Sequence, residues 1–470
     1  MFRFAASKIG RRSVHSAFRF VRPTVNPASF LQESRSFSTA QPMVTDSAMF
    51  CRQCEQTKDN YACTTLGVCG KTPETSAIQD TLIQVIKTVS IWAVAAREAG
   101  IPVSPAINEW TIKAAFSTMT NVNFSEDRIA TYIREGIKFQ EELAKLVPNH
   151  TPTGHVAELS LHSGLTNFEL EEFGQAVSVP VRQNRMGDND CFSLNEIGTY
   201  GIKGVSAYAS HVWQIRGTIG EDIMAGIHEV WAKLDSNKAD MNGLLANALR
   251  VGEINGAVLN LLDAAHADTY GSPVPTEVKV SAVEGKAILI SGHDMADLKA
   301  LLEQTEGTGI NVYTHGEMLP AHGYPELKKH SHLVGNYGTA WQNQKIEFAM
   351  FPGPVVVTTN CIIEPRRVYK KRIYTMNEVG FDGVEHIGET RDFSPVIAQA
   401  QKEKGFKTTI EPARYHTVGF NHRVVLPLAN QIIDAAKSGA LSRIFLIGGC
   451  DGTVRLLKLL LCCCCHCCID

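Results

Sequence analysis

The stretch KAILISGHDMADLKALLEQTEGTGINVYTHG, residues 286–316, contains two short apolar runs separated by a helical pattern. The runs are KAILISG and INVYTHG, and each ends in glycine. Short apolar runs that alternate with helices are typical of parallel sheets, because the helices form the crossover connections. The stretch therefore predicts a strand, a helix and a second parallel strand of a wound α/β domain.

The same alternation continues toward the carboxyl terminus. PVVVTTN (354–360) and RIFLIGG (443–449) have the pattern of strands, while SPVIAQAQKE (394–403) and PLANQIIDAAKSG (427–439) have that of helices. The change from helical patterns to alternating strands and helices begins near residues 271–280, GSPVPTEVKV. From there on, the pattern predicts parallel sheets in wound α/β domains.

The preceding region is predicted to be largely helical. In DTLIQVIKTVSIWAVAAREAG (80–100) the apolar residues recur at a helical period, and the pattern stops at Gly100 with Pro102 beyond it. Further helical patterns lie at 126–147, 195–214 and 241–271. Residues 75–268 are therefore predicted to form a helical bundle.

Composition excludes two classes of partner. The chain has 470 residues, with 45 basic and 48 acidic side chains, so no overall basic field favours nucleic acid or an anionic membrane. No stretch approaches the roughly 20 apolar residues that cross a bilayer. We expect neither nucleic acid nor a membrane as a partner.

The first 42 residues differ from the rest of the chain. They carry seven basic side chains against one acid, Glu33, and are rich in Ser and Phe. An Arg-rich, acid-poor start is typical of an organelle transit peptide, which predicts the mitochondrial matrix, with another organelle or the cytoplasm as alternatives. The structural alternative is a basic surface arm that stays on the protein.

Four cysteines are concentrated near the amino terminus of the helical region. Cys51, Cys54, Cys63 and Cys69 are separated by gaps of two, eight and five residues. A reducing matrix disfavours disulfides, so metal binding is the better interpretation. The spacing favours an iron–sulfur cluster held by one loop, and zinc or unligated thiols remain alternatives.

Four further candidate ligands each follow a predicted strand: His293, Glu317, Cys361 and Cys450. Ligands of open α/β sheets bind outside the carboxyl ends of the strands, so these side chains are expected to converge. A mixture of imidazole, carboxylate and thiolate suits an iron centre with open coordination positions. Taken singly, each residue could instead be a helix cap, a turn residue or buried filler.

The remaining cysteine and histidine candidates are predicted to lie outside the site. Cys191 has no comparable partner and is assigned to the core. The same assignment is made for four histidines in polar sequence, which are His315, His322, His330 and His332.

Several long strings together resemble one family. They are MFCRQCEQTKDNYACTTLGVCGKTPE, SGHDMADLKALLEQTEGTGINVYTHGEMLPAHGYPELKKHSHLVGNYGTAWQNQ, FPGPVVVTTNCI and FLIGGCDG. They closely resemble the hybrid-cluster proteins, also called hydroxylamine reductases or prismane proteins, over roughly residues 49–453. The resemblance implies a multidomain α and α/β fold, with a helical amino-terminal domain followed by two Rossmann-like domains.

The composition of the first 42 residues, the change of pattern near residue 271 and the resemblance together predict the domain limits. They are a transit peptide at 1–42, a helical domain with the cysteine loop at 43–270, a first Rossmann-like domain at 271–365 and an incomplete second one at 366–470.

The resemblance implies two cofactors. Cys51, Cys54, Cys63 and Cys69 match the ligands of a 4Fe-4S cluster. His293, Glu317, Cys361 and Cys450 match four ligands of a hybrid 4Fe-2O-2S cluster, and Cys450 matches the cysteine that can carry a persulfide.

The implied reaction is the two-electron reduction of hydroxylamine to ammonia and water. Nitric oxide reduction and peroxidase chemistry are related activities of the family. The implied partners are a small nitrogen-oxide substrate, an electron donor such as a ferredoxin or flavin reductase, and a second copy of the chain in a homodimer.

The final residues depart from the family pattern. After FLIGGCDG the family continues with two more cluster cysteines, a second glutamate and a nearby lysine, whereas this chain has TVRLLKLLLCCCCHCCID. Adjacent cysteines cannot replace ligands placed at separate strand ends. We expect an error at the end of the gene model. The alternatives are a truncated, non-catalytic 4Fe-4S protein, a soft-metal tract in the tail, or a zinc-loop interaction protein.

Overall fold

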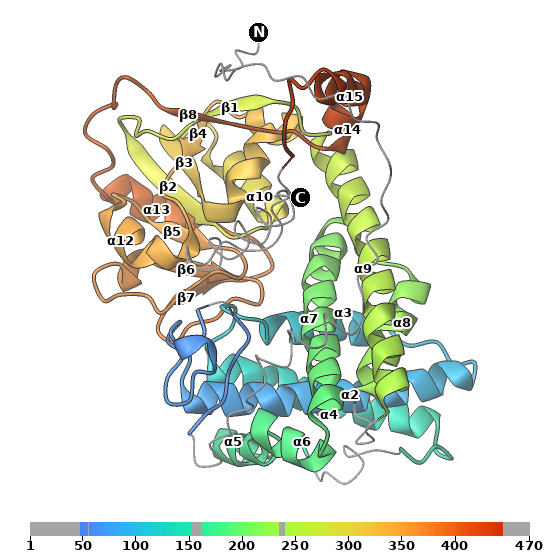
Figure 1. Cartoon of the computed structure of the whole chain (residues 1–470). Helices are drawn as coiled ribbons and strands as arrows, with labels where there is room; N and C mark the ends of the chain where they lie inside the picture. Colours follow the sequence, from blue (N-terminus) through green and yellow to red (C-terminus); the bar gives the residue numbers. More distant parts are fainter. Residues whose placement is uncertain (1–47, 55, 153–160, 235–239, 445–470) are drawn as a thin grey trace. The chain divides into compact units, whose positions relative to one another are not determined.

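The computed structural model describes residues 48–54, 56–152, 161–234 and 240–444 (Figure 1). The predicted transit segment, the Cys-rich tail, Cys450 and nearly all of the strand predicted at 443–449 lie outside these residues. Within them, no helix combines the length and apolar character that a bilayer crossing requires.

The helical prediction is confirmed for the first half of the chain. The helices are α2 (Pro73–Glu98), α3 (Pro105–Ser117), α4 (Glu126–Leu146), α5 (Asn167–Ala176), α6 (Val179–Met186), α7 (Asn189–Arg216), α8 (Glu221–Lys233) and α9 (Met241–Tyr270). α7 and α9 run side by side (Figure 1). A separate hydrophobic core, with Ile86, Ile202 and Trp231 fully buried, holds these helices together.

Helix α2 begins earlier than the apolar period alone predicts. The Thr72 side chain accepts a hydrogen bond from Thr75 N at 3.1 Å, and Pro73 occupies the first turn. A capping oxygen followed by proline is a strong start signal for a helix, because the cap satisfies a free N–H and proline needs none. Local capping, rather than the apolar stripe, sets this boundary.

A six-stranded sheet follows, with the order β4-β3-β2-β5-β6-β7 and all neighbours parallel. Its strands are β2 (Lys286–Ser291), β3 (Ile310–His315), β4 (Leu333–Asn336), β5 (Val355–Val357), β6 (Ile373–Met376) and β7 (Glu385–Ile387). The helices among and after these strands are α10 (Met295–Thr305), α11 (Pro325–Lys328), α12 (Gln344–Met350) and α13 (Ser394–Lys402). The parallel α/β architecture is therefore confirmed.

Both faces of this sheet are covered. In β2, Ile288 and Ile290 belong to one hydrophobic core, while Ala287 and Leu289 belong to another. Because successive side chains of a strand point to opposite faces, a sheet buried on both sides needs a continuous apolar run. This requirement explains the unbroken string AILI.

The sheet extends beyond residue 365, where a domain boundary was predicted. β6 and β7 follow that position and pair with β5 and with each other. The predicted boundary therefore falls inside one sheet, and the division into domains remains a prediction.

The last described segment forms smaller elements. β1 (Thr276–Lys279) and β8 (Tyr415–Val418) pair as an antiparallel ribbon, and two helices follow, α14 (His422–Val425) and α15 (Ala429–Lys437). Five short 3-10 turns complete the described elements: η2 (Lys58–Asn60), η4 (Gly316–Gly323), η5 (Trp341–Asn343), η6 (Lys370–Arg372) and η7 (Leu426–Leu428). The predicted helices at 394–403 and 427–439 correspond to α13 and α15.

Candidate metal sites

Three of the four strand-end candidates converge. β3, β2 and β5 are adjacent and parallel, so their carboxyl ends lie at one edge of the sheet. His293, Glu317 and Cys361 follow these three strands, and their ligand atoms all lie within 4.8 Å of one another. We call these three residues the strand-end cluster. The fourth candidate, Cys450, lies outside the described residues.

The position of His293 depends on a close approach of two strand ends. Gly292 has φ +114°, and a Cβ there would lie 2.4 Å from Thr358 Oγ1. Thr359 Oγ1 accepts a hydrogen bond from His293 N at 2.7 Å and contacts Nδ1 at 2.9 Å. The hydrogen bond at Nδ1 fixes the imidazole ring and directs Nε2 toward the cluster. Metal-bound histidines are commonly oriented in this way, by a hydrogen bond from the ring nitrogen that does not bind the metal.

Glu317 is the most accessible member of the cluster. It lies at the start of η4, with 51% of its side chain exposed, and its Oε2 is hydrogen-bonded to His293 Nε2. This hydrogen bond outweighs burial and holds the pKa of Glu317 below its usual value. The carboxylate is therefore ionised at neutral pH, the form that binds a metal.

Cys361 has an unusual backbone conformation. Its φ is +74°, a region that non-glycine residues seldom adopt and that costs of order 1–3 kcal/mol. The buried Gln344 amide bridges the chain around it: Nε2 donates to Cys361 O, and Oε1 accepts from Ile363 N at 3.3 Å. Tertiary contacts thus hold the turn that directs the thiol.

A cavity of about 670 Å³ opens in front of the strand-end cluster, and Tyr208, His315, Trp341 and Gln342 line it with the cluster residues. Gln342 Oε1 is buried without a hydrogen-bond partner. The cavity is a suitable size for a small-molecule site.

His315 requires a correction. It was assigned to polar loop sequence outside the site, but it is the buried last residue of β3 and lines the cavity. Its ring contacts Ser291 Oγ and Glu347 Oε2, both at 2.9 Å. Its place at a strand end, two residues before Glu317, was the signal that could have found it.

The predictions for the other residues assigned to the core agree better with the structure. Cys191, His322 and His330 are buried, as predicted, and His332 is half-buried. No further metal-ligand group among the described residues includes any of them.

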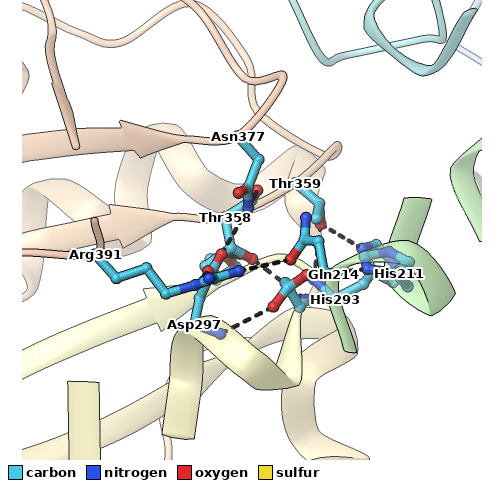
Figure 2. Close-up of polar contacts among 10 residues, drawn as sticks. His211, Gln214, His293, Asp297, Thr358, Thr359, Asn377 and Arg391 are labelled. Carbon is cyan, nitrogen blue, oxygen red and sulfur yellow. Dashed lines mark hydrogen bonds and ion pairs between the residues drawn. The ribbon is translucent and has the colours of Figure 1, made fainter. Parts of the chain in front are cut away.

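A polar network that includes His211, Asp297 and Arg391 lies close to His293 of the strand-end cluster (Figure 2). His211 Nδ1 of α7 contacts Asp294 Oδ2 at 3.1 Å. Arg391 donates to Asp297 Oδ1 at 2.7 Å and to Gln214 Oε1 at 3.0 Å. Burial and the charge of Asp294 raise the pKa of Asp297 well above its usual value, against the effect of Arg391. These contacts tie helix α7 to the carboxyl edge of the sheet.

The cysteine loop, residues 49–71, folds back on itself. Cys51 N donates to Cys63 O at 3.0 Å, and Cys63 N donates to Cys51 O at 2.8 Å. Gly70, with φ +98°, makes the turn after Cys69. A single loop therefore carries all four thiols, with Cys63 buried and the others half-buried.

The loop thiols need a positive centre if they ionise together. Burial raises the pKa of Cys54 and of Cys69, and the charges of neighbouring loop thiolates raise it further, while nearby hydrogen bonds and Lys71 lower it. Four thiolates this close are unfavourable without a bound cation. The donor set therefore fits a metal centre.

The spacing of the loop thiols argues against a single zinc ion. Among the described residues, the strand-end cluster is the only group of three or more such ligands within 4.8 Å of one another, so no three loop thiols meet that limit. A zinc–sulfur bond of about 2.3 Å would place tetrahedral thiolates about 3.8 Å apart. An iron–sulfur cluster does not need its thiolates this close, because its own atoms separate them.

A parallel α/β sheet with mixed ligands at one edge, joined to a helical bundle with a four-thiol loop, defines a metalloprotein with two distinct centres. The chain belongs to the Prismane/CO dehydrogenase family, which matches residues 49–455. This membership makes iron–sulfur and hybrid clusters the cofactors of the protein.

Similar curated proteins include two enzymes named hydroxylamine reductase. The protein from Maridesulfovibrio salexigens is 47% identical over 404 residues, covering 86% of this chain and 73% of the relative. The protein from Salmonella paratyphi C is 46% identical over 411 residues, covering 86% and 74%. A solved acetyl-CoA synthase/carbon monoxide dehydrogenase is 14% identical with a TM-score of 0.37, covering 88% of this chain and 63% of that one, which is too distant to support an argument.

Proposed function

We propose that this protein is an iron–sulfur oxidoreductase that reduces hydroxylamine to ammonia and water. The observation that carries the proposal is the convergence of His293, Glu317 and Cys361 within 4.8 Å at one wall of a cavity of about 670 Å³. The hydroxylamine reductases among the relatives support the choice of substrate. The reaction consumes two electrons and two protons for each hydroxylamine.

The candidate ligands have separate roles in this proposal. His293, Glu317 and Cys361 would hold the hybrid cluster, with Cys450 as a fourth ligand, and Cys51, Cys54, Cys63 and Cys69 would hold the 4Fe-4S cluster. When bound, the hybrid cluster supplies electrons and a Lewis-acidic metal position for the oxygen of the N–O bond.

The protein itself would position the cluster ligands. Thr359 holds the His293 ring at Nδ1, and Gln344 holds the turn of Cys361. These contacts preorganise the ligands, so that little rearrangement is needed when the substrate binds.

The proposal extends to partners and location. We propose a ferredoxin or flavin reductase as electron donor, a homodimer as the assembly and the mitochondrial matrix as the location. The location is supported by the Arg-rich segment at 1–42, which lies outside the described residues. Nitric oxide reduction and peroxidase activity are proposed as side activities.

The test measures hydroxylamine turnover with reduced viologen in anaerobically prepared full-length protein. Glu317→Gln and His293→Ala should abolish turnover while the visible absorbance of the loop cluster stays. Glu326→Gln is the matched control, because that carboxylate lies on α11 and pairs with Lys329 at the surface. A wild-type protein that holds iron but does not turn over would refute the proposed function.

A further inference from the structure

Two buried lysines flank the cysteine loop. Lys71 lies two positions after Cys69, and Lys203 lies on α7; only 2% and 1% of their surfaces are exposed. A buried ammonium group loses its hydration and needs polar or negative partners, so buried lysines are rare. The partners of these two side chains indicate what their charges do.

Lys203 is hydrogen-bonded to the loop itself. Its Nζ donates to Gln53 Oε1 at 2.8 Å, and Gln53 lies between Cys51 and Cys54. The centroid of the Tyr200 ring lies 5.9 Å from the same Nζ, a distance at which an aromatic face stabilises a cation. These contacts hold the ammonium group beside the segment that carries the first two cysteines of the loop.

The acidic side chains nearby face a cation of their own. Arg182 Nη2 of α6 lies 3.9 Å from Asp80 Oδ1 and 3.3 Å from Glu196 Oε1. These three side chains, Lys203 and Cys51 line one cavity of only about 20 Å³, which has room for about one water molecule. Bulk solvent therefore does not screen the charge of Lys203 from the loop.

Lys203 carries its charge in mildly acidic solution. Burial, more than the charge of Lys71, lowers the pKa of Lys203 to about 7. The negative charges of Cys51, Asp80 and Glu196 act against this shift. An electron added to the loop would favour the ammonium form further, because it adds negative charge.

Lys71 provides a second positive charge at the other end of the loop. Its backbone N–H is hydrogen-bonded to the Cys69 thiol, and its Nζ donates to Gln79 Oε1 of α2 at 2.6 Å. The charge of Lys71 acts to lower the pKa of Cys69, which means that it favours negative charge on the loop.

We propose that Lys203 and Lys71 raise the reduction potential of the iron–sulfur centre in the cysteine loop, because their buried charges stabilise its reduced form. The inference rests on the proposed function, since it presumes that the loop holds an iron–sulfur cluster and receives electrons. One electron enters from the donor protein and adds one negative charge to the centre, and no bond of the protein forms or breaks. A cation in a desolvated position stabilises that added charge.

The test is a redox titration of the full-length holoprotein at a pH below 7, followed by the paramagnetic resonance signal of the reduced loop centre. Lys203→Met removes the charge and the hydrogen bond but keeps an unbranched side chain. Lys203→Gln removes the charge but keeps an amide donor, and Lys71→Met removes the second charge. Lys299→Met is the matched control, because this lysine of α10 is 37% exposed and its charge is screened by solvent and salt.

The expected effect is a lower potential in all three variants of the buried lysines. At a fixed solution potential, the ratio of reduced to oxidised loop centre should fall about tenfold, which is equivalent to about 59 mV for a one-electron couple. Lys299→Met should match the wild type. Iron content and the visible absorbance of the loop cluster, measured on the same samples, should be unchanged in every variant.

The outcomes separate this inference from the proposed function. Variants of either lysine that keep an intact loop cluster and the wild-type potential would overturn the inference for that lysine. A potential that falls in Lys203→Met but not in Lys203→Gln would also overturn it, since the hydrogen bond rather than the charge would then be responsible. If the Lys203 variants lose the cluster, Lys71→Met still tests the effect of a buried charge.

The titration requires no hydroxylamine. A wild-type protein that fails to turn over therefore refutes the proposed function but leaves the role of the two lysines to be decided by the potentials. A loop that holds no iron in the wild-type protein would overturn both.

Discussion

Replacement of Gly292 by alanine should destabilise the protein and displace His293. The new Cβ would lie 2.4 Å from Thr358 Oγ1 and 2.7 Å from Thr359 N, closer than atoms can approach without a shift of the strand ends. Overpacking of this kind costs about 1–3 kcal/mol. The φ of +114° is strained for any side chain and adds about 1–3 kcal/mol. The expected total is a loss of about 2–6 kcal/mol.

The glycine at position 307 offers a matched control. It also has a positive φ, of +72°, but a Cβ there would meet no atom within 4 Å. Gly307→Ala should therefore cost only the backbone contribution of about 1–2 kcal/mol, partly offset by about 0.4–1 kcal/mol from a less flexible unfolded chain. The difference between the two variants reports the contact between the strand ends together with the greater backbone strain at φ +114°.

Urea unfolding of both variants provides the assay, together with iron content relative to the absorbance of the loop cluster. Gly292→Ala should unfold at a clearly lower urea concentration. It should also lose iron from the strand-end cluster, because the new Cβ would press on Thr359, whose hydroxyl is hydrogen-bonded to His293. Equal midpoints and equal iron contents in the two variants would refute the steric reasoning.

Three further predictions test other contacts. Thr359→Val, which removes the oxygen bonded to His293, should weaken iron binding at the strand-end cluster about 10- to 100-fold, whereas Thr359→Ser should not, as measured by iron titration. Burial lowers the pKa of His228 from 6.5 to about 3. Between these two pH values, the unfolded chain therefore binds a proton at His228 that the folded chain does not bind. Stability should therefore decrease as the pH is lowered through that window, by at most about 1.4 kcal/mol per pH unit, and urea unfolding should show a smaller dependence on pH in His228→Gln. Cys51→Ser should interrupt turnover with a protein electron donor, and unimpaired turnover would contradict the role of the loop.

Much of the fold could be predicted because local patterns encode it. Apolar runs such as AILI in β2 are needed wherever a strand is buried on both faces, and the helical period of α4 follows from one buried stripe. The convergence of His293 and Glu317 was also predictable, since consecutive parallel strands end at the same edge.

Other features depend on which strands are neighbours. The boundary predicted at residue 365 falls inside one sheet, because β6 pairs with β5 and strand order leaves no local signal. His315 was misplaced for a related reason: its sequence is polar, but the strand continues through it and the surrounding elements bury it.

By itself, the sequence determined the elements and the types of ligand: a helical region with a four-thiol loop, then strands followed by His293, Glu317 and Cys361. Only the tertiary structure decided how these ligands are held. Asn121 and Ile362 are 241 positions apart, yet they share two hydrogen bonds. Periodicity reports which face of an element is buried, whereas hydrogen-bond partners from distant segments are set only when the elements pack.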